Sequence, residues 1–142
     1  MFSLIEVFMS RNQLLRDVES IIQGAGFECR HGSDSMTYQK NVSVEGLIEG
    51  GRDKFHFLLH TTKGDLPIVV RWQEVNGTAL QKLGHTVLMA VNTEYNEFLV
   101  ICGGRKLVMR AINYLNDHKK VAPKLNAIQD YELEDILLEN YV

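Results

Sequence analysis

The clearest pattern in this chain runs through residues 67–73 and the turn that follows them. The segment opens on an apolar, β-branched run and continues with alternating polar and apolar positions, which is typical of a buried strand. Because alternate side chains of a strand share a face, we expect Val69, Arg71 and Gln73 on one face of the sheet. Residues 76–78, Asn-Gly-Thr, break this pattern, and a helical period of apolar residues follows. The segment therefore predicts a strand, a turn and a helix in close succession.

Apolar periodicity predicts the remaining elements in the same way. Apolar residues at steps of three and four indicate helices, and short β-branched runs bounded by glycine or polar turns indicate strands. The elements expected in chain order are a helix over 14–25, a short strand at 27–30, a polar loop over 31–41, strands at 42–48, 55–60 and 66–73, a helix over 80–91, a strand at 97–102, a helix from 107 that ends by 120, and a last short helix over 131–139. Capping boxes at Ser3 with Glu6 and at Ser10 with Gln13 leave two starting points open for the first helix.

The order of these elements predicts an α/β fold, with a mixed β-sheet flanked by helices. Three consecutive strands between residues 42 and 73 form a meander, and the strand, helix and strand over 66–102 need a right-handed crossover between parallel neighbours. A meander plus one crossover is therefore expected. With 142 residues, 45% of them hydrophobic, and two prolines, the chain suits a single domain over residues 1–142.

Charge is distributed unevenly towards the C-terminal end. Residues 105–124 contain six Lys or Arg and one acid, whereas residues 125–142 contain five acids and no base. Clustered Lys and Arg attract a phosphate backbone through counterion release, so the basic stretch is a candidate for nucleic-acid contact. The alternative is a solvated helix face that the acidic tail neutralises. The net charge of -3 is too small to decide between the two.

The two cysteines and the apolar runs set the expected compartment. Cys29 and Cys102 are far apart and form no C-x-x-C pair, so we expect reduced thiols rather than a disulfide framework or a zinc site. No run reaches the ~18 apolar residues of a membrane span. The first ten residues lack the basic start of a signal peptide. These features predict a cytoplasmic protein with no membrane association.

Residues 53–103 resemble the core of the PD-(D/E)XK nuclease-like domains, which have the restriction-endonuclease fold. Small members of that family carry a core strand E-x-K-W/Y-Q, then S-G-T-A and a downstream Lys. The positions here that match this motif are Val69, Arg71, Trp72, Gln73, Asn76, Gly77, Thr78, Ala79 and Lys82. The preceding hairpin is similar to the strand that supplies the family's metal-binding Asp. His56 occupies that position in the simplest register, and Asp53 fills it if the strand is shifted or bulged.

The resemblance implies a catalytic centre that has lost its cation ligands. In the family, the Asp and Glu hold Mg²⁺ against the scissile phosphate, and the Lys positions water and offsets the developing charge. Val69 offers no oxygen, His56 is a poor ligand for Mg²⁺, and Arg71 stays protonated but can hold a phosphate through its donors. We therefore expect a degenerate, non-cleaving centre at Asp53, His56, Arg71 and Gln73 and no metal cofactor. The predicted nucleic-acid contacts, with DNA as the first candidate, are Arg71, Lys82, Arg105, Lys106 and Arg110.

Two other functions stay open. An active endonuclease would hold Mg²⁺ or Mn²⁺ between Asp53 and either Glu19 or Glu45, since such folds often carry an accessory acid on the first helix, where Glu19 lies. A protein-interaction or inhibitor module without nucleic-acid contact would suit the mildly acidic net charge and the acidic tail. The resemblance is also compatible with a homodimer, because nucleases of this fold often act as pairs, and with a phage or mobile-element origin. His85, in the middle of the helix over 80–91, is expected to be a packing or surface residue.

Overall fold

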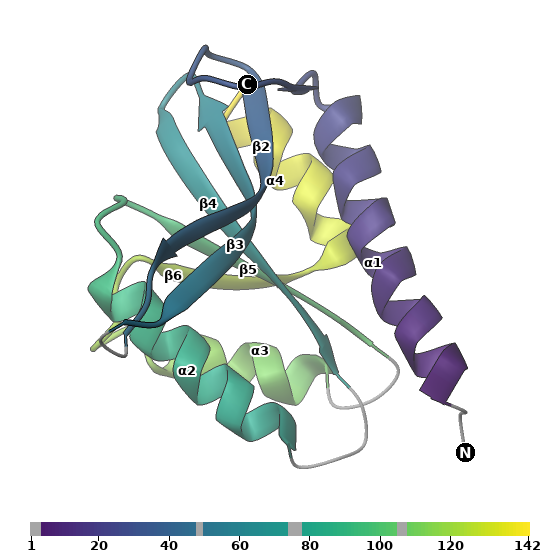
Figure 1. Ribbon diagram of the computed structural model, residues 1–142, viewed down its shortest axis with the longest axis vertical. Helices are drawn as coiled ribbons and strands as arrows, with labels where there is room; N and C mark the ends of the chain where they lie inside the picture. Colours follow the sequence, from purple (N-terminus) through teal and green to yellow (C-terminus); the bar gives the residue numbers. More distant parts are fainter. Residues whose placement is uncertain (1–3, 48–49, 74–77, 105–107) are drawn as a thin grey trace.

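The computed structural model describes residues 4–47, 50–73, 78–104 and 108–142, with side chains for all of these except residues 4–10 and 78–80. One six-stranded sheet, in the order β1-β2-β3-β4-β5-β6, forms the centre of the molecule (Figure 1). The elements are α1 (Leu4–Gly24), β1 (Glu28–Cys29), β2 (Thr37–Glu45), β3 (Arg52–Thr61), β4 (Gly64–Gln73), α2 (Thr78–Asn92), β5 (Phe98–Gly104), α3 (Val108–Asp117), β6 (Leu125–Gln129), a 3-10 turn (Asp130–Glu132) and α4 (Leu133–Asn140). The predicted α/β fold class, a mixed sheet flanked by helices, is confirmed.

The strands pair as a meander followed by parallel crossovers. β2, β3 and β4 are antiparallel neighbours, and β4, β5 and β6 are parallel and connected through α2 and α3. The expectation of one crossover is wrong, because β6 adds a second. Its sequence, Leu-Asn-Ala-Ile-Gln, is too short and too mixed to stand out as a strand. Leu125, Ala127 and Ile128 are nevertheless buried in the hydrophobic cores.

The expected polar loop over residues 31–41 is also wrong, because β2 begins at Thr37. Tyr38 is fully buried, and its hydroxyl group bonds to side chains of α1: it donates to Glu19 Oε2 at 2.6 Å and accepts from Gln23 Nε2 at 2.9 Å. These long-range partners satisfy the hydroxyl and let the first residues of β2, Thr37 and Tyr38, lie buried. Composition within residues 37–41 gives no sign of them.

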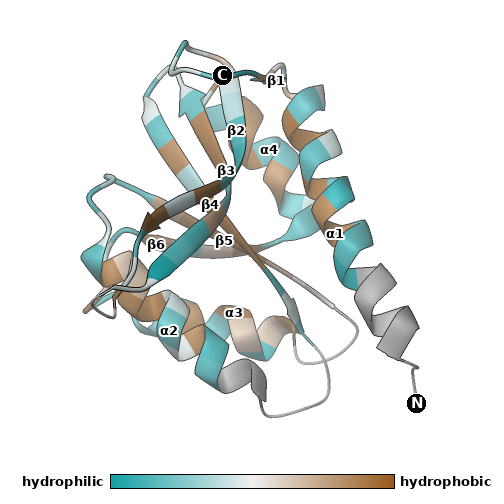
Figure 2. Cartoon of the chain, viewed as in Figure 1, coloured by the Kyte–Doolittle hydropathy of each residue, from teal (hydrophilic) through white to brown (hydrophobic). Residues whose placement is uncertain are grey.

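Two hydrophobic cores lie on opposite faces of the sheet. α1 and α4 cover one face and α2 and α3 cover the other (Figure 1). Figure 2 shows that β5, between the two cores, is hydrophobic along most of its length. The predicted alternation in β4 is observed: Val70 belongs to the α1/α4 core, Val69 belongs to the α2/α3 core, and Arg71 bonds to α2. None of the described helices is long and apolar enough to span a membrane.

The hairpin of β2 and β3 changes faces partway along its length. Phe57 packs in the α1/α4 core and Phe55 packs in the α2/α3 core, although residues two apart in a strand normally share a face. The register of the hairpin is the same on both sides of this point, but the pair of Asn41 and His56 is missing from the ladder, and Asn41 has φ 53°. β3 pairs with β4 only from Phe57 onwards. The C-terminal half of β4 therefore has no paired strand on the edge that faces β3.

Candidate functional site

A cavity of about 350 Å³ lies where β3 separates from β4. Side chains from α1, β2, β3, β4 and α2 line it, so it occupies the position at which the hairpin has changed faces. Its charged lining residues are all basic: Arg11, Lys54, Arg71 and Lys82. Among the described residues that line the cavity, no carboxylate is present. The arrangement can bind an anion.

Arg71 is the cation of this basic cavity that lies on β4. Its Nε donates to Thr86 Oγ1 at 2.9 Å, and that hydroxyl in turn donates to the carbonyl oxygen of Lys82 at 2.7 Å. These bonds fix the guanidinium group against α2. Burial lowers the pKa of Arg71 from its ordinary value, and the nearby charge of Arg11 acts in the same direction, whereas Asp53 opposes it. An anion in the cavity would relieve this crowding of positive charge.

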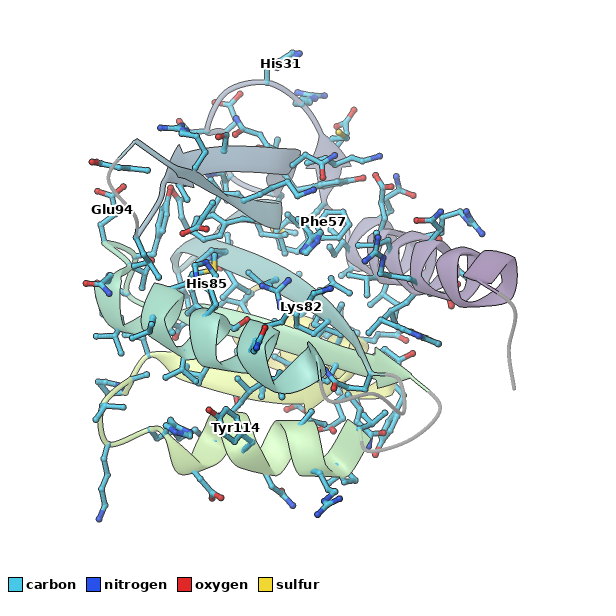
Figure 3. All side chains as sticks on the ribbon, turned by 60° about the horizontal axis from the view of Figure 1, so that its bottom comes forward. His31, Phe57, Lys82, His85, Glu94 and Tyr114 are labelled. Atoms are coloured by element: carbon cyan, nitrogen blue, oxygen red, sulfur yellow. The ribbon has the colours of Figure 1, made fainter. Side chains whose placement is uncertain are left out.

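Lys82 lies on the side of α2 that faces β3 and β4, as does His85 one turn later (Figure 3). Lys54 of β3 and Lys82 both line the cavity, and both are exposed to solvent. The downstream Lys of the motif thus lines the same cavity as Arg71, and so does Gln73, which is buried. Arg11 and Lys54 were not predicted as site residues.

His56 lines the cavity as a neutral hydrogen-bonding group. Its Nδ1 accepts the backbone N–H of Val70 at 2.9 Å, so the neutral ring carries its proton on Nε2. Burial lowers the pKa of His56 to about 4, and the positive charges of Arg71, Lys54 and Arg11 add to this effect. His56 thus accepts a backbone N–H of β4 at the point where β3 no longer pairs with that strand. Its Nε2–H is a hydrogen-bond donor and cannot bind a metal ion.

Acidification below pH 6.5 is expected to destabilise the fold through His56. The unfolded chain binds a proton with the ordinary pKa of 6.5, whereas the folded chain resists it down to about 4. Stability that is present above pH 6.5 is therefore lost as the pH falls through this window. Urea unfolding of the wild type and of His56→Gln at neutral pH and at about pH 5 measures the effect. Gln can still accept the Val70 N–H but does not titrate, so the variant should lose less stability; an equal loss in both proteins would contradict the prediction.

Asp53 lies beside a different cavity. Its Oδ1 is 2.9 Å from Nε2 of His85, and its Oδ2 accepts the backbone N–H of Leu47 at 3.3 Å. With Glu45 it lines a neighbouring cavity of about 400 Å³ between β2, β3 and the end of α2. His85 is therefore a hydrogen-bond partner of Asp53 as well as a partly exposed helix residue. Because the two are 32 positions apart, no local pattern could predict this pair.

Glu19 holds α1 against β2. Oε2 accepts the hydroxyl of Tyr38 at 2.6 Å, and Oε1 lies 3.1 Å from Nζ of Lys40. Burial favours a higher pKa for Glu19, but the bonds from Tyr38 and Lys40 outweigh it and hold the pKa below the ordinary value. Both oxygens thus have partners on the sheet, and Glu19 does not line the basic cavity.

The residues that line the basic cavity do not fit the Mg²⁺ or Mn²⁺ of an active centre. Val69 is fully buried in the α2/α3 core and offers no oxygen. Asp53 and Glu19 make their bonds elsewhere, and in the described part of the chain no group of three His, Cys, Asp or Glu side chains could hold a metal ion. A hard dication requires several oxygen ligands, which the basic cavity does not supply.

None of the described residues of the basic stretch, 108–124, lines this cavity. Arg105 and Lys106 lie outside the described residues. Arg110 is exposed on α3 and is not among the residues that line the cavity. Of the five predicted nucleic-acid contacts, the structure brings Arg71 and Lys82 together.

Comparison with known proteins adds one match. A family model described as a PD-(D/E)XK nuclease superfamily domain matches residues 9–140, which is nearly the whole chain. No curated protein and no solved structure matches the chain.

Proposed function

Because this chain belongs to the PD-(D/E)XK nuclease superfamily, we propose that it is a nuclease-like domain that binds nucleic acid, DNA in the first place, and does not cleave it. The binding site is the basic cavity between α1, β3, β4 and α2. Its four cations come from four separate elements, so the tertiary fold, rather than a run of charged sequence, concentrates them.

One observation carries this proposal: the charged lining of the cavity is basic throughout. Nucleic-acid affinity arises largely from Lys and Arg that neutralise phosphates. A phosphate placed here would meet the forked donors of Arg71, the ammonium groups of Lys54 and Lys82, and the N–H of His56. A dication placed here would meet like charges and no carboxylate, which supports binding without metal-dependent cleavage.

Arg71 replaces the Lys of the family motif in a way that suits binding. Arg cannot release its proton, so it cannot serve as a base, but its planar group can hold a phosphate through two donors at once. Its Nε is already bonded to Thr86, which leaves the guanidinium oriented before a ligand arrives.

A combined binding and cleavage assay tests the proposal. Supercoiled plasmid and single-stranded DNA are incubated with the purified protein, with Mg²⁺ or Mn²⁺ and with EDTA, and gel shifts are read on the same samples. We expect a shift at low salt that weakens as salt rises, with no cleavage under any metal condition. Cleavage that EDTA and Asp53→Ala both abolish would overturn the non-cleaving function and support a rearranged metal centre. Absence of any shift at low salt would overturn nucleic-acid binding and leave a protein-interaction module.

A further inference from the structure

Besides its cations, the basic cavity is lined by uncharged polar side chains and by apolar side chains. Three amide side chains, Asn12 of α1, Asn41 of β2 and Gln73 of β4, carry both donors and acceptors. Leu15 and Trp72 provide apolar surface in the same lining. A free phosphate would use the cations and the N–H of His56, so the amides and the apolar surface suit a larger ligand.

The size of the cavity limits what that ligand can be. About 350 Å³ lies at the lower end of the ~300–1,000 Å³ of small-ligand pockets, which is enough for one nucleotide. A base that is paired and stacked in a duplex cannot enter such a space unless it leaves the stack. A nucleotide of a single strand meets no such obstacle.

Trp72 supplies the surface on which a base could stack. Its side chain is half-buried on β4, packs against the α1/α4 core and forms part of the cavity wall. Stacking of a base on an aromatic ring tightens binding by about 5- to 150-fold and tolerates any base, because every base has a flat face. The amides of Asn12 and Gln73 have the donors and acceptors that base edges require.

We propose that this cavity takes one unpaired nucleotide of a single-stranded nucleic acid, with its phosphate on the cations and its base against Trp72. The inference rests on the proposed function and adds to it the form of the substrate. A surface that only contacts the phosphate backbone of a duplex would not have this preference for an unpaired nucleotide.

The experiment uses Trp72 as its own reporter, since it is the only tryptophan in the chain. Tryptophan emission and calorimetry are followed while the protein is titrated with inorganic phosphate, with the mononucleotide dAMP, with a short single-stranded oligonucleotide, and with a blunt hairpin duplex of matched length. We expect dAMP to quench the emission and to bind at least about fivefold tighter than inorganic phosphate. The single strand should bind tighter than the duplex at equal salt.

Two variants separate the base from the phosphate. Trp72→Phe should keep the affinity for inorganic phosphate and lose part of the gain for dAMP, as read by calorimetry. If Trp72→Phe folds poorly, Asn12→Ala serves the same purpose, because Asn12 is a partly exposed helix residue. This variant is expected to lower the affinity for dAMP and to leave the affinity for inorganic phosphate unchanged. Thermal melts of each variant establish that it is folded.

The outcomes distinguish this inference from the proposed function. Equal affinities for phosphate and dAMP, together with a duplex that binds as tightly as the single strand, would overturn the nucleotide pocket and leave phosphate binding in place. Failure of all four ligands to bind would overturn both. A gain for dAMP that Trp72→Phe does not reduce would also contradict the placement of the base.

Discussion

The double variant Lys54→Glu with Lys82→Glu is expected to lose nucleic-acid binding at physiological salt. Both lysines line the basic cavity and both are exposed, so their exchange changes the charge of the site without removing buried packing. At about 0.15 M salt, each lost phosphate contact costs roughly fivefold in affinity through counterion release, and two contacts cost roughly 30-fold. The two introduced carboxylates add repulsion, so the measured loss should exceed this value.

Fluorescence anisotropy over a range of salt concentrations measures the loss, and the salt dependence should also become shallower by roughly 0.7 to 0.9 for each lost contact. The matched control is Arg16→Glu with Arg30→Glu, which changes the net charge equally at two exposed residues that do not line the cavity. If the control loses as much affinity as the test variant, overall charge and not the cavity governs binding. Wild-type affinity in the Lys54 and Lys82 variant would remove the cavity from the mechanism.

Gly104→Ala is expected to destabilise the fold by about 3–5 kcal/mol, a large share of the total stability of a typical domain. Gly104 has φ 142°, a conformation that side chains rarely adopt. A Cβ there would lie 2.8 Å from the backbone nitrogen of Gln73 and would clash still more severely with the Gln73 carbonyl oxygen. Because the obstacle is the backbone of the paired strand β4, no side-chain rotation can relieve it.

Urea unfolding of Gly104→Ala and of Gly32→Ala separates the cost of backbone strain from the cost of the steric clash. Gly32 also has a positive φ, 97°, but nothing lies within 4 Å of its Cβ position, so its exchange should cost only about 1–2 kcal/mol of backbone strain. We expect the difference between the variants to report the clash with Gln73. Similar losses for both would show that β4 and β5 can move apart at this end, and the floor of the basic cavity would then be less rigid than the structure implies.

Local pattern predicted most of the fold, and the errors have physical causes. The strand over 66–73, the helix over 80–91 and the strand at 97–102 are confirmed, because buried parallel strands and an amphipathic helix have strong and different periods. The predicted turn at Asn76 and Gly77 lies outside the described residues. The start of β2 does not stand out in the sequence, because the hydroxyl of Tyr38 is satisfied by Glu19 and Gln23 and this polar side chain can therefore be fully buried. β6 was missed because five residues are too few to show a period.

The candidate site was predictable only in part. The resemblance to the family motif pointed to His56, Arg71, Gln73 and Lys82, and the structure places all four around one cavity. It did not point to Arg11 or Lys54, because their approach depends on the packing of α1 and on the change of faces within the hairpin. Strict strand alternation, applied to residues 52–61, cannot show such a change.

The face change at Asn41 and His56 also bears on how the molecule unfolds. Because β2 and β3 each contribute side chains to both hydrophobic layers, neither layer can melt while the other keeps its full complement of partners. The two halves of the interior are therefore joined into one cooperative unit, and heating should give a single calorimetric transition rather than two. A ligand held at the crossing point would stabilise both layers together.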